Sequence, residues 1–110
     1  MAPCRAAINQ FLRQLKVNLQ FLSYWDFVSK EVAEAHMETQ RVPGHAQEFE
    51  TAFALAVFPD SVRTADIDDE DAKLGTPEMG KVLVEATVAG TTEFVSGMLE
   101  GTVQAELTGL

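Results

Sequence analysis

Apolar residues recur at helical spacing in four stretches of the chain. In each stretch they return every three or four residues, as on one face of an α-helix. In the last stretch, Pro77 falls in the first turn, where the missing N–H of proline would have no helical partner. The predicted helices cover residues 4–16, 27–40, 45–58 and 76–99.

Two segments between these helices read as strands. The aromatic and aliphatic run "VNLQFLSYWDF" predicts a strand over about residues 18–24, and "SVRTADI" predicts a short one at residues 61–67. An acidic loop follows at residues 68–78. Helices alternating with strands favour a parallel sheet covered on both faces. We therefore expect an α/β fold, a helix-rich partial three-layer sandwich with few parallel strands, which either finds further strands in a partner or has lost its own.

Composition bounds the function. At 110 residues and 46% hydrophobic content, the chain forms a single domain, 1–110. Its formal net charge of -9 argues against binding nucleic acid or an anionic membrane. One cysteine excludes an internal disulfide and a cysteine-based zinc cluster. With no signal-like start and no run of 18 apolar residues, we expect a cytoplasmic protein that does not contact a membrane.

The segment "RVPGHAQEFETAFALAVF", residues 41–58, places Glu50 in an apolar helix. At about 100° per residue, its helical neighbours are Phe53, Ala54 and Val57. A helix that is apolar almost all round is expected to be buried on most faces. A buried carboxylate must be paired, bound to a metal or protonated, since an isolated buried charge is very costly.

Two interpretations of this segment stay open. In the first, Glu50 is the inward carboxylate of a pocket, and its partner is His45 or the Trp25-Asp26 pair upstream. In the second, His45 is a loop residue, Glu48 is a favourable charge near the amino end of the helix, and Glu50 is exposed by a gap in the packing.

Common metal motifs do not account for these residues. The two histidines are nine positions apart and form no HExxH pair. The acidic run from Asp66 resembles a calcium loop, but Asp71 stands where that loop needs glycine. A solvated acidic turn is the better interpretation.

Two segments together resemble a known family. They are "LSYWDFV" at residues 22–28 and "GHAQEFETAFALAVFPDSV" at residues 44–62, and both are similar to the creatininase (creatinine amidohydrolase) family. The second matches an H-(A/G)-G-x-x-E-T-S-like helix start and a P-x-x-V exit. The matching positions are His45, Glu50, Thr51, Pro59 and Val62.

The resemblance implies a parallel sheet between helices, a ring-like oligomer and a metal-dependent hydrolase of cyclic or small amides. It implies that His45 handles protons or the tetrahedral centre, and that Glu50 supports it, as the catalytic residues. It implies that Trp25 lines the substrate pocket. Asp26 lies beside Trp25 at the carboxyl end of the predicted strand, where open α/β sheets bind ligands. We expect Asp26 and Glu48 to bind substrate together with Trp25.

The chain departs from the family pattern. The family binds zinc or manganese through its amino-terminal half, which has no counterpart here, and Gln47 and Ala52 replace a glycine and a serine of the motif. We therefore expect the carboxyl-terminal half of a creatininase-like protein, without a bound metal or other cofactor. Its expected role is a homo-oligomeric binding or assembly module with a small-molecule ligand. The alternative is a small enzyme that uses a Trp25, His45 and Glu50 pocket for acid–base or hydrolytic chemistry.

Overall fold

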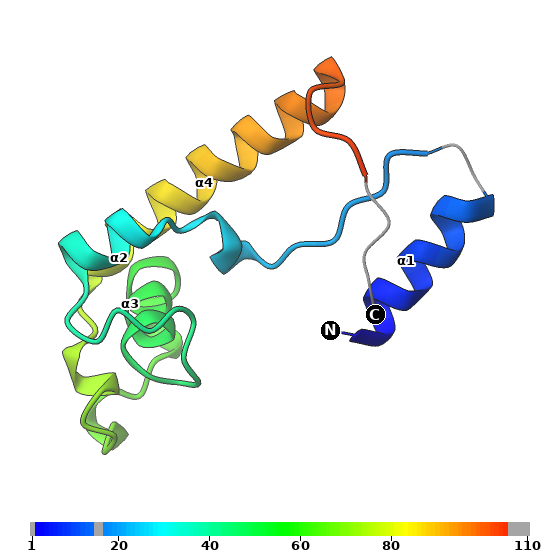
Figure 1. Cartoon of the computed structure of the whole chain (residues 1–110). Helices are drawn as coiled ribbons and strands as arrows, with labels where there is room; N and C mark the ends of the chain where they lie inside the picture. Colours follow the sequence, from blue (N-terminus) through cyan, green and yellow to red (C-terminus); the bar gives the residue numbers. More distant parts are fainter. Residues whose placement is uncertain (1, 15–16, 106–110) are drawn as a thin grey trace. The chain divides into compact units, whose positions relative to one another are not determined.

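The computed structural model describes residues 2–14 and 17–105, and this part of the chain contains helices and turns but no strand (Figure 1). Four α-helices are joined by segments that include four short 3-10 turns. The helices are α1 (Ala2–Gln14), α2 (Lys30–His36), α3 (Glu48–Val57) and α4 (Pro77–Glu100), and the turns are η1 (Tyr24–Phe27), η2 (Pro59–Ser61), η3 (Thr64–Asp66) and η4 (Ala72–Leu74).

The chain divides into two compact units. One combines residues 1–23 with residues 92–110, and the other is the continuous segment 24–91. In the first unit, the Asn18 side chain donates a hydrogen bond of 2.7 Å to the carbonyl oxygen of Val103. Helix α4 ends in this unit at Glu100, and the next residue, Gly101, has a φ of 83°, the left-handed conformation that commonly stops a helix.

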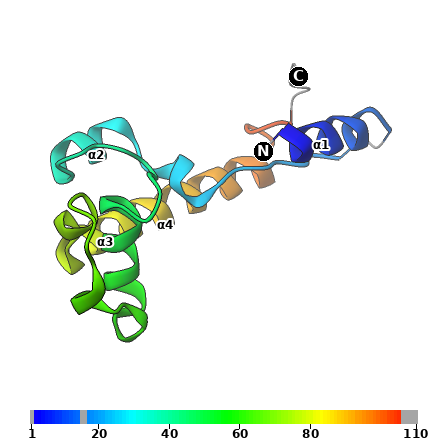
Figure 2. The ribbon, with the colours of Figure 1, turned by 90° about the horizontal axis from the view of Figure 1, so that it is seen from below.

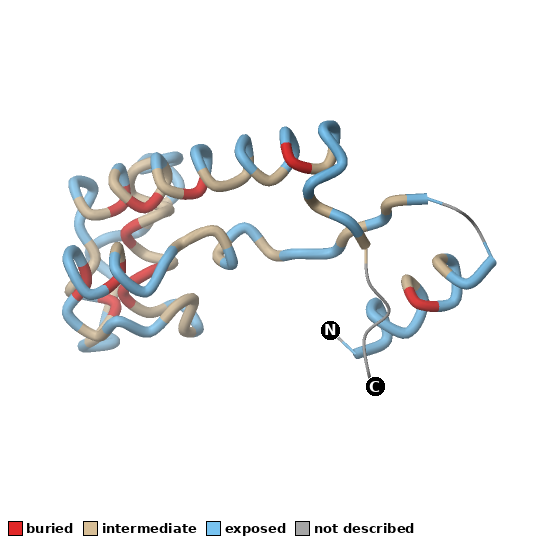
Figure 3. The backbone as a smooth tube through the Cα atoms, turned by 45° about the horizontal axis from the view of Figure 1, so that its top comes forward, coloured by how far each residue is buried: buried red, intermediate tan, exposed pale blue. Residues whose placement is uncertain are grey.

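The second unit holds the main hydrophobic core and the residues of interest. Its buried side chains gather where α2, α3 and the first turns of α4 meet (Figure 3). Partly buried residues, among them Trp25 and Phe53, pack around this cluster. The buried cluster consists of Ala33, Met37, Phe49, Ala52 and Leu83.

Helices α3 and α4 approach each other closely at one point (Figure 2). A Cβ atom added to Gly80 would overlap the carbonyl oxygen of Ala52 and lie 2.9 Å from the Cβ of Ala56. The two helices can touch backbone to backbone here because all three residues are small.

The starts of α2 and α4 follow from local capping. The Ser29 side chain accepts a hydrogen bond from the Val32 N–H at 3.1 Å, and the Thr76 hydroxyl accepts one from the Met79 N–H at 3.1 Å. Each satisfies a backbone donor that the first turn of a helix leaves without a partner. Pro77 is the first residue of α4, as predicted.

The predicted α/β sandwich is wrong for the part of the chain that the structure describes. Residues 18–23 run without regular structure and residues 24–27 form η1, where a strand over 18–24 was expected. Residues 61–67 contain η3 instead of the second strand. An apolar run becomes a strand only when a neighbour completes its hydrogen-bond ladder. Here the Val28 N–H bonds back to the Trp25 carbonyl at 3.1 Å, which closes a turn.

The positions of the helices were predicted more accurately than those of the strands. The helix expected at residues 45–58 is confirmed as α3 from Glu48 onward, whereas residues 45–47 belong to the loop before it. The helix expected at residues 76–99 is confirmed as α4, and the helix at 4–16 is confirmed as α1. Residues 15 and 16 of that last prediction lie outside the described residues. The helix expected over 27–40 is shorter, because Ser29 caps its start and Met37 takes an extended conformation at its end.

Helix α4 also meets the length and composition of a membrane span. Over an 18-residue window its mean hydropathy is 1.2, and 11% of that window is buried. A single helix that meets these two criteria is weak evidence for a membrane protein. Lys81, Glu85 and Glu93 interrupt its apolar surface.

Candidate functional site

The loop that joins α2 to α3 carries His45 and has an unusual backbone. Gln40 and Ala46 have positive φ values of 57° and 50°, a conformation that costs free energy for residues other than glycine. Gly44, at φ 65°, takes the same conformation without that cost. The loop must therefore be held in place by contacts, and two carboxylates of α3 supply them.

Glu48 holds the start of the loop. Its side chain is fully buried, and its two carboxylate oxygens accept hydrogen bonds from the backbone N–H groups of Glu38 and Thr39, at 2.9 and 2.8 Å. The Thr39 hydroxyl adds a third hydrogen bond of 2.8 Å. Three donors replace the water that the buried carboxylate has lost. Glu48 therefore anchors the loop to α3.

Glu50 holds the end of the loop. It is half-buried and its Oε2 atom accepts a hydrogen bond from the backbone N–H of Ala46. Gln47 is the N-cap of α3, so Glu50 is the third helical residue. A glutamate at this position commonly bonds back to the chain that enters the helix. Glu50 thus fixes the residue that follows His45.

His45 and Glu50 line one hollow of about 460 Å³, which we call the acidic hollow. Its floor is apolar, formed by residues such as Ala54 and Val62. The polar residues that line it are His45, Glu50, Thr51, Asp68 and Asp69.

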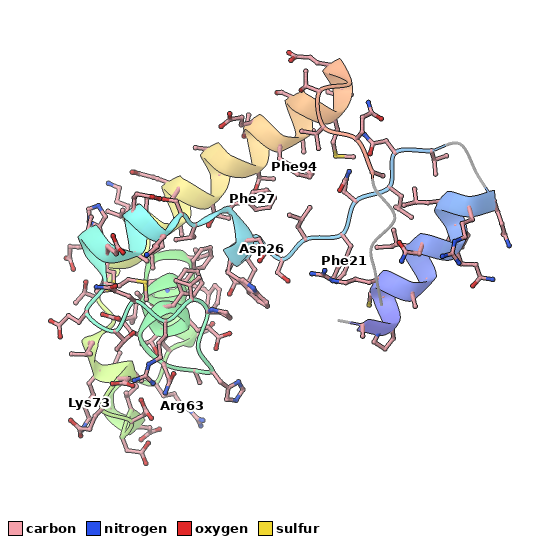
Figure 4. The ribbon with its side chains drawn as sticks, in the orientation of Figure 1. Phe21, Asp26, Phe27, Arg63, Lys73 and Phe94 are labelled. Atoms are coloured by element: carbon pink, nitrogen blue, oxygen red, sulfur yellow. The ribbon has the colours of Figure 1, made fainter. Side chains whose placement is uncertain are left out.

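The described residues that line the acidic hollow include three carboxylates and no lysine or arginine. The cations nearby have acidic partners outside the lining, although Lys73 also interacts electrostatically with Asp68 and Asp69. Arg63 and Lys73, which lie on the segment between α3 and α4 (Figure 4), pair with Asp66 at 3.7 Å and with Glu70 at 2.9 Å. Arg41 pairs with Asp71 at 3.3 Å. The hollow therefore favours a ligand that is cationic or rich in hydrogen-bond donors.

Glu50 also borders a second hollow of about 580 Å³, which we call the aromatic hollow. Tyr24, Phe53 and Phe58 line it together with Glu50 and Ala54. Burial, and then the negative charge of Glu50, raise the pKa of Tyr24 above its usual value. The carboxylate of Glu50 therefore interacts electrostatically with the phenol of Tyr24, which lines this second hollow.

The structure places the predicted site residues in different surroundings. His45 is exposed and shares the acidic hollow with Glu50, whereas Glu48 is buried beneath the loop. Trp25 packs against the core and against Tyr24, with ring centroids 5.1 Å apart. Asp26 is exposed on η1 (Figure 4). Neither Trp25 nor Asp26 lines the acidic hollow.

Several residues that line the hollows are not predicted as site residues from the sequence, among them Asp68, Asp69, Tyr24 and Phe58. Asp68 and Asp69 belong to the predicted solvated acidic turn, and in the "SYWDF" segment the predicted site residues are Trp25 and Asp26. The density of carboxylates after residue 65 was the available signal for the first two. For Tyr24 the signal was its place in the same "SYWDF" segment as Trp25.

The described residues do not fit a zinc or manganese centre of the kind the resemblance implies. No three histidine, cysteine, aspartate or glutamate side chains among residues 2–14 and 17–105 converge on one point. His45, Glu50 and the two aspartates line the same hollow without reaching a common position. A structural or catalytic zinc site uses three or four such ligands.

The comparisons with known proteins gave one match. The family model Creatininase, described as creatinine amidohydrolase, matches residues 1–99. This range includes η1, the loop at His45, α3 and both hollows. No curated protein and no solved structure matched the chain.

Proposed function

The chain belongs to the creatininase family, and we propose that it is a metal-independent binding module for a small, donor-rich molecule. Membership relates it to hydrolases of the creatinine amidohydrolase type. The observation that carries the proposal is the acidic hollow, which is lined by His45 and Glu50 of the family motif, by Asp68 and Asp69, and by apolar side chains.

The dimensions and charge of the hollow support this role. A volume of about 460 Å³ lies within the range of small-molecule sites. Carboxylates accept hydrogen bonds from amide, amidine or ammonium groups, and the imidazole of His45 can donate or accept one. The apolar floor at Val62 and Ile67 would cover the carbon skeleton of the ligand.

The second candidate function is acid–base catalysis in the same hollow. It is favoured by the presence of one imidazole and three carboxylates in the lining of one hollow, since imidazole and carboxylate groups are the usual general acids and bases. We rank it second because the described residues do not assemble the metal ligands that activate water in metal-dependent hydrolases.

Creatinine is the first probe to test, since the family model is described by it. We expect it to shift the amide NMR signals of Ala46, Glu50, Thr51 and Asp68 in a saturable way, with Kd on the order of 1 mM. Asp68→Asn and Glu50→Gln should each weaken binding roughly fivefold, about 1 kcal/mol. Glu50→Gln should leave the fold intact, because the amide oxygen can still accept the Ala46 N–H.

Asp60→Asn is the matched control, since Asp60 is exposed and lies outside the hollow. Creatine formation is measured in the same samples, with and without added zinc or manganese, and none above the protein-free rate is expected. Creatine that accumulates in proportion to protein would support the catalytic candidate. Shifts that never saturate, or that avoid the hollow, would reject both.

We also propose that the chain self-associates. The described residues bury six hydrophobic side chains, while eleven large hydrophobic side chains are exposed. Where such side chains form a contiguous patch, the patch is commonly covered by another chain. The exposed set is Phe11, Val17, Leu19, Phe21, Leu22, Tyr24, Val57, Phe58, Val88, Val95 and Leu99.

We expect sedimentation velocity at about 10 µM, a concentration at which micromolar contacts are populated, to give a dimer or larger species. Because the contact would be apolar, the species should persist in 0.5 M NaCl, roughly the range in which surface ion pairs are screened. A single monomeric boundary with cooperative unfolding would contradict the proposal.

A further inference from the structure

The aromatic hollow combines a cluster of rings with a carboxylate at its edge. Tyr24 is surrounded by other aromatic side chains, with ring centroids 5.0 Å from Phe53 and 6.0 Å from Phe49. Phe49 is fully buried, and it lies 5.8 Å from Phe53. The buried ring therefore anchors Tyr24 and Phe53, so that part of the wall is in place before any ligand arrives.

The wall of the aromatic hollow remains accessible. Tyr24 is 40% exposed and Phe58 is 51% exposed, while Phe53 is partly buried between them and the core. An apolar space bounded by three rings would suit a neutral hydrocarbon as well as a cation. The carboxylate of Glu50 distinguishes the two occupants.

Glu50 brings negative charge to an otherwise apolar wall. The hydrogen bond from the Ala46 N–H holds its side chain in place. Its charge reaches the ring of Tyr24, where it adds to burial in raising the pKa of the phenol. A bound apolar molecule would leave the carboxylate of Glu50 beside a surface that cannot compensate its charge. A bound cation would compensate that charge.

We propose that the aromatic hollow binds small organic cations that carry a methylated ammonium group, held by the faces of Tyr24, Phe53 and Phe58 and by the carboxylate of Glu50. Aromatic rings attract such cations through their negative faces, and the attraction grows as water is excluded. The net charge of -9 adds a long-range attraction for cations. This site differs from the acidic hollow in all its residues except Glu50 and Ala54, and it does not depend on the function proposed for that hollow.

Choline and its neutral analogue 3,3-dimethyl-1-butanol test the proposal, because they share a shape and differ in charge. Binding is followed by NMR titration of the full-length protein. We expect choline to bind at least five times more tightly than the alcohol, and to shift signals of Tyr24, Phe53 and Phe58. Equal affinity for both probes, or no binding of choline up to 50 mM, well above the range typical of weak specific sites, would overturn the proposal.

Two phenylalanines of equal exposure provide matched variants. Phe58 is 51% exposed in the aromatic hollow, and Phe11 is 52% exposed on α1. Phe58→Leu keeps an apolar side chain but removes the ring, and it should weaken choline binding at least threefold. Phe11→Leu should leave the affinity unchanged. If the two variants behave alike, the ring of Phe58 has no role in binding and the proposal is wrong.

The phenol of Tyr24 provides a second readout, since it is the sole tyrosine of the chain. Ultraviolet titration should give a lower pKa for Tyr24 in choline chloride than in sodium chloride of equal concentration, because the bound cation stabilises the phenolate. An unchanged pKa of Tyr24 would place choline elsewhere and overturn the proposal.

Asp68→Asn should leave choline binding intact while it weakens creatinine binding. The proposals for the two hollows can therefore be rejected independently. A loss of choline binding in Asp68→Asn would show that the aromatic hollow is not a separate site, and would also count against the proposal.

Discussion

Replacing Glu48 by glutamine is expected to lower the free energy of unfolding by about 2–3 kcal/mol, the typical value of a hydrogen bond to a charged group. The buried carboxylate accepts three hydrogen bonds, from the N–H groups of Glu38 and Thr39 and from the Thr39 hydroxyl. An amide offers one oxygen, and its NH₂ group would face a backbone donor. At least one buried donor therefore loses its acceptor. Chemical denaturation followed by tryptophan fluorescence would measure the change.

Glu78→Gln is the matched control for this prediction. Glu78 lies in the first turn of α4, as Glu48 lies in the first turn of α3, so both have the same favourable relation to a helix dipole. Glu78 is exposed, and its replacement should cost less than about 1 kcal/mol. Thr39→Val replaces the hydroxyl by a methyl group, which removes its hydrogen bond to Glu48 and the one it accepts from the Arg41 N–H, and it should cost an intermediate amount. If Glu48→Gln matched Glu78→Gln, the buried anchor would not contribute to stability.

The sequence supports the helices of this fold better than their packing. Helical periodicity identifies α1, α3 and α4, and Pro77 locates the start of α4, whereas the start of α2 at Ser29 was not predicted. These features are local and depend on neighbours within one or two turns. Strand pairing is not local. The run at residues 18–24 has the composition of a strand, but the described residues supply no neighbouring strand to pair with it.

The roles of the two glutamates show a second limit. Both belong to the first turn of α3, and the sequence favoured Glu50 as the inward carboxylate. The structure buries Glu48 completely and leaves Glu50 half-buried between two hollows. A helical wheel gives angles between side chains, but it does not say which side faces the neighbouring helix. That choice depends on where α4 can approach, and it can approach only where the side chains are small.

The close approach of α3 and α4 leads to the second large expected effect. Gly80→Ala should destabilise the fold by about 2 kcal/mol or more, within the usual range for an overpacked core. The new methyl group would overlap the carbonyl oxygen of Ala52 and lie 2.5 Å from its carbonyl carbon, so α3 and α4 would have to separate. Separation would loosen the contact between Leu83 and the buried ring of Phe49, which belong to the same cluster.

Helix propensity favours alanine over glycine, so it opposes the steric effect of Gly80→Ala. The sign of the change in the free energy of unfolding therefore shows which of the two effects is larger. In a helix that nothing contacts, glycine to alanine stabilises by about 1 kcal/mol. Ala89→Gly, at an exposed position of the same helix, measures that propensity in this protein and should destabilise by a similar amount. Suppose instead that Gly80→Ala stabilised the protein by the amount that Ala89→Gly destabilises it. The helices α3 and α4 would then not be in backbone contact at Gly80.

Glu48 and Ala52 lie one turn apart on the same side of α3, so the burial of Glu48 would also lose its explanation. A net loss of stability would show that steric contact at Gly80 exceeds propensity. It would also support the orientation of α3 that places Glu50, and with it both hollows, at the surface.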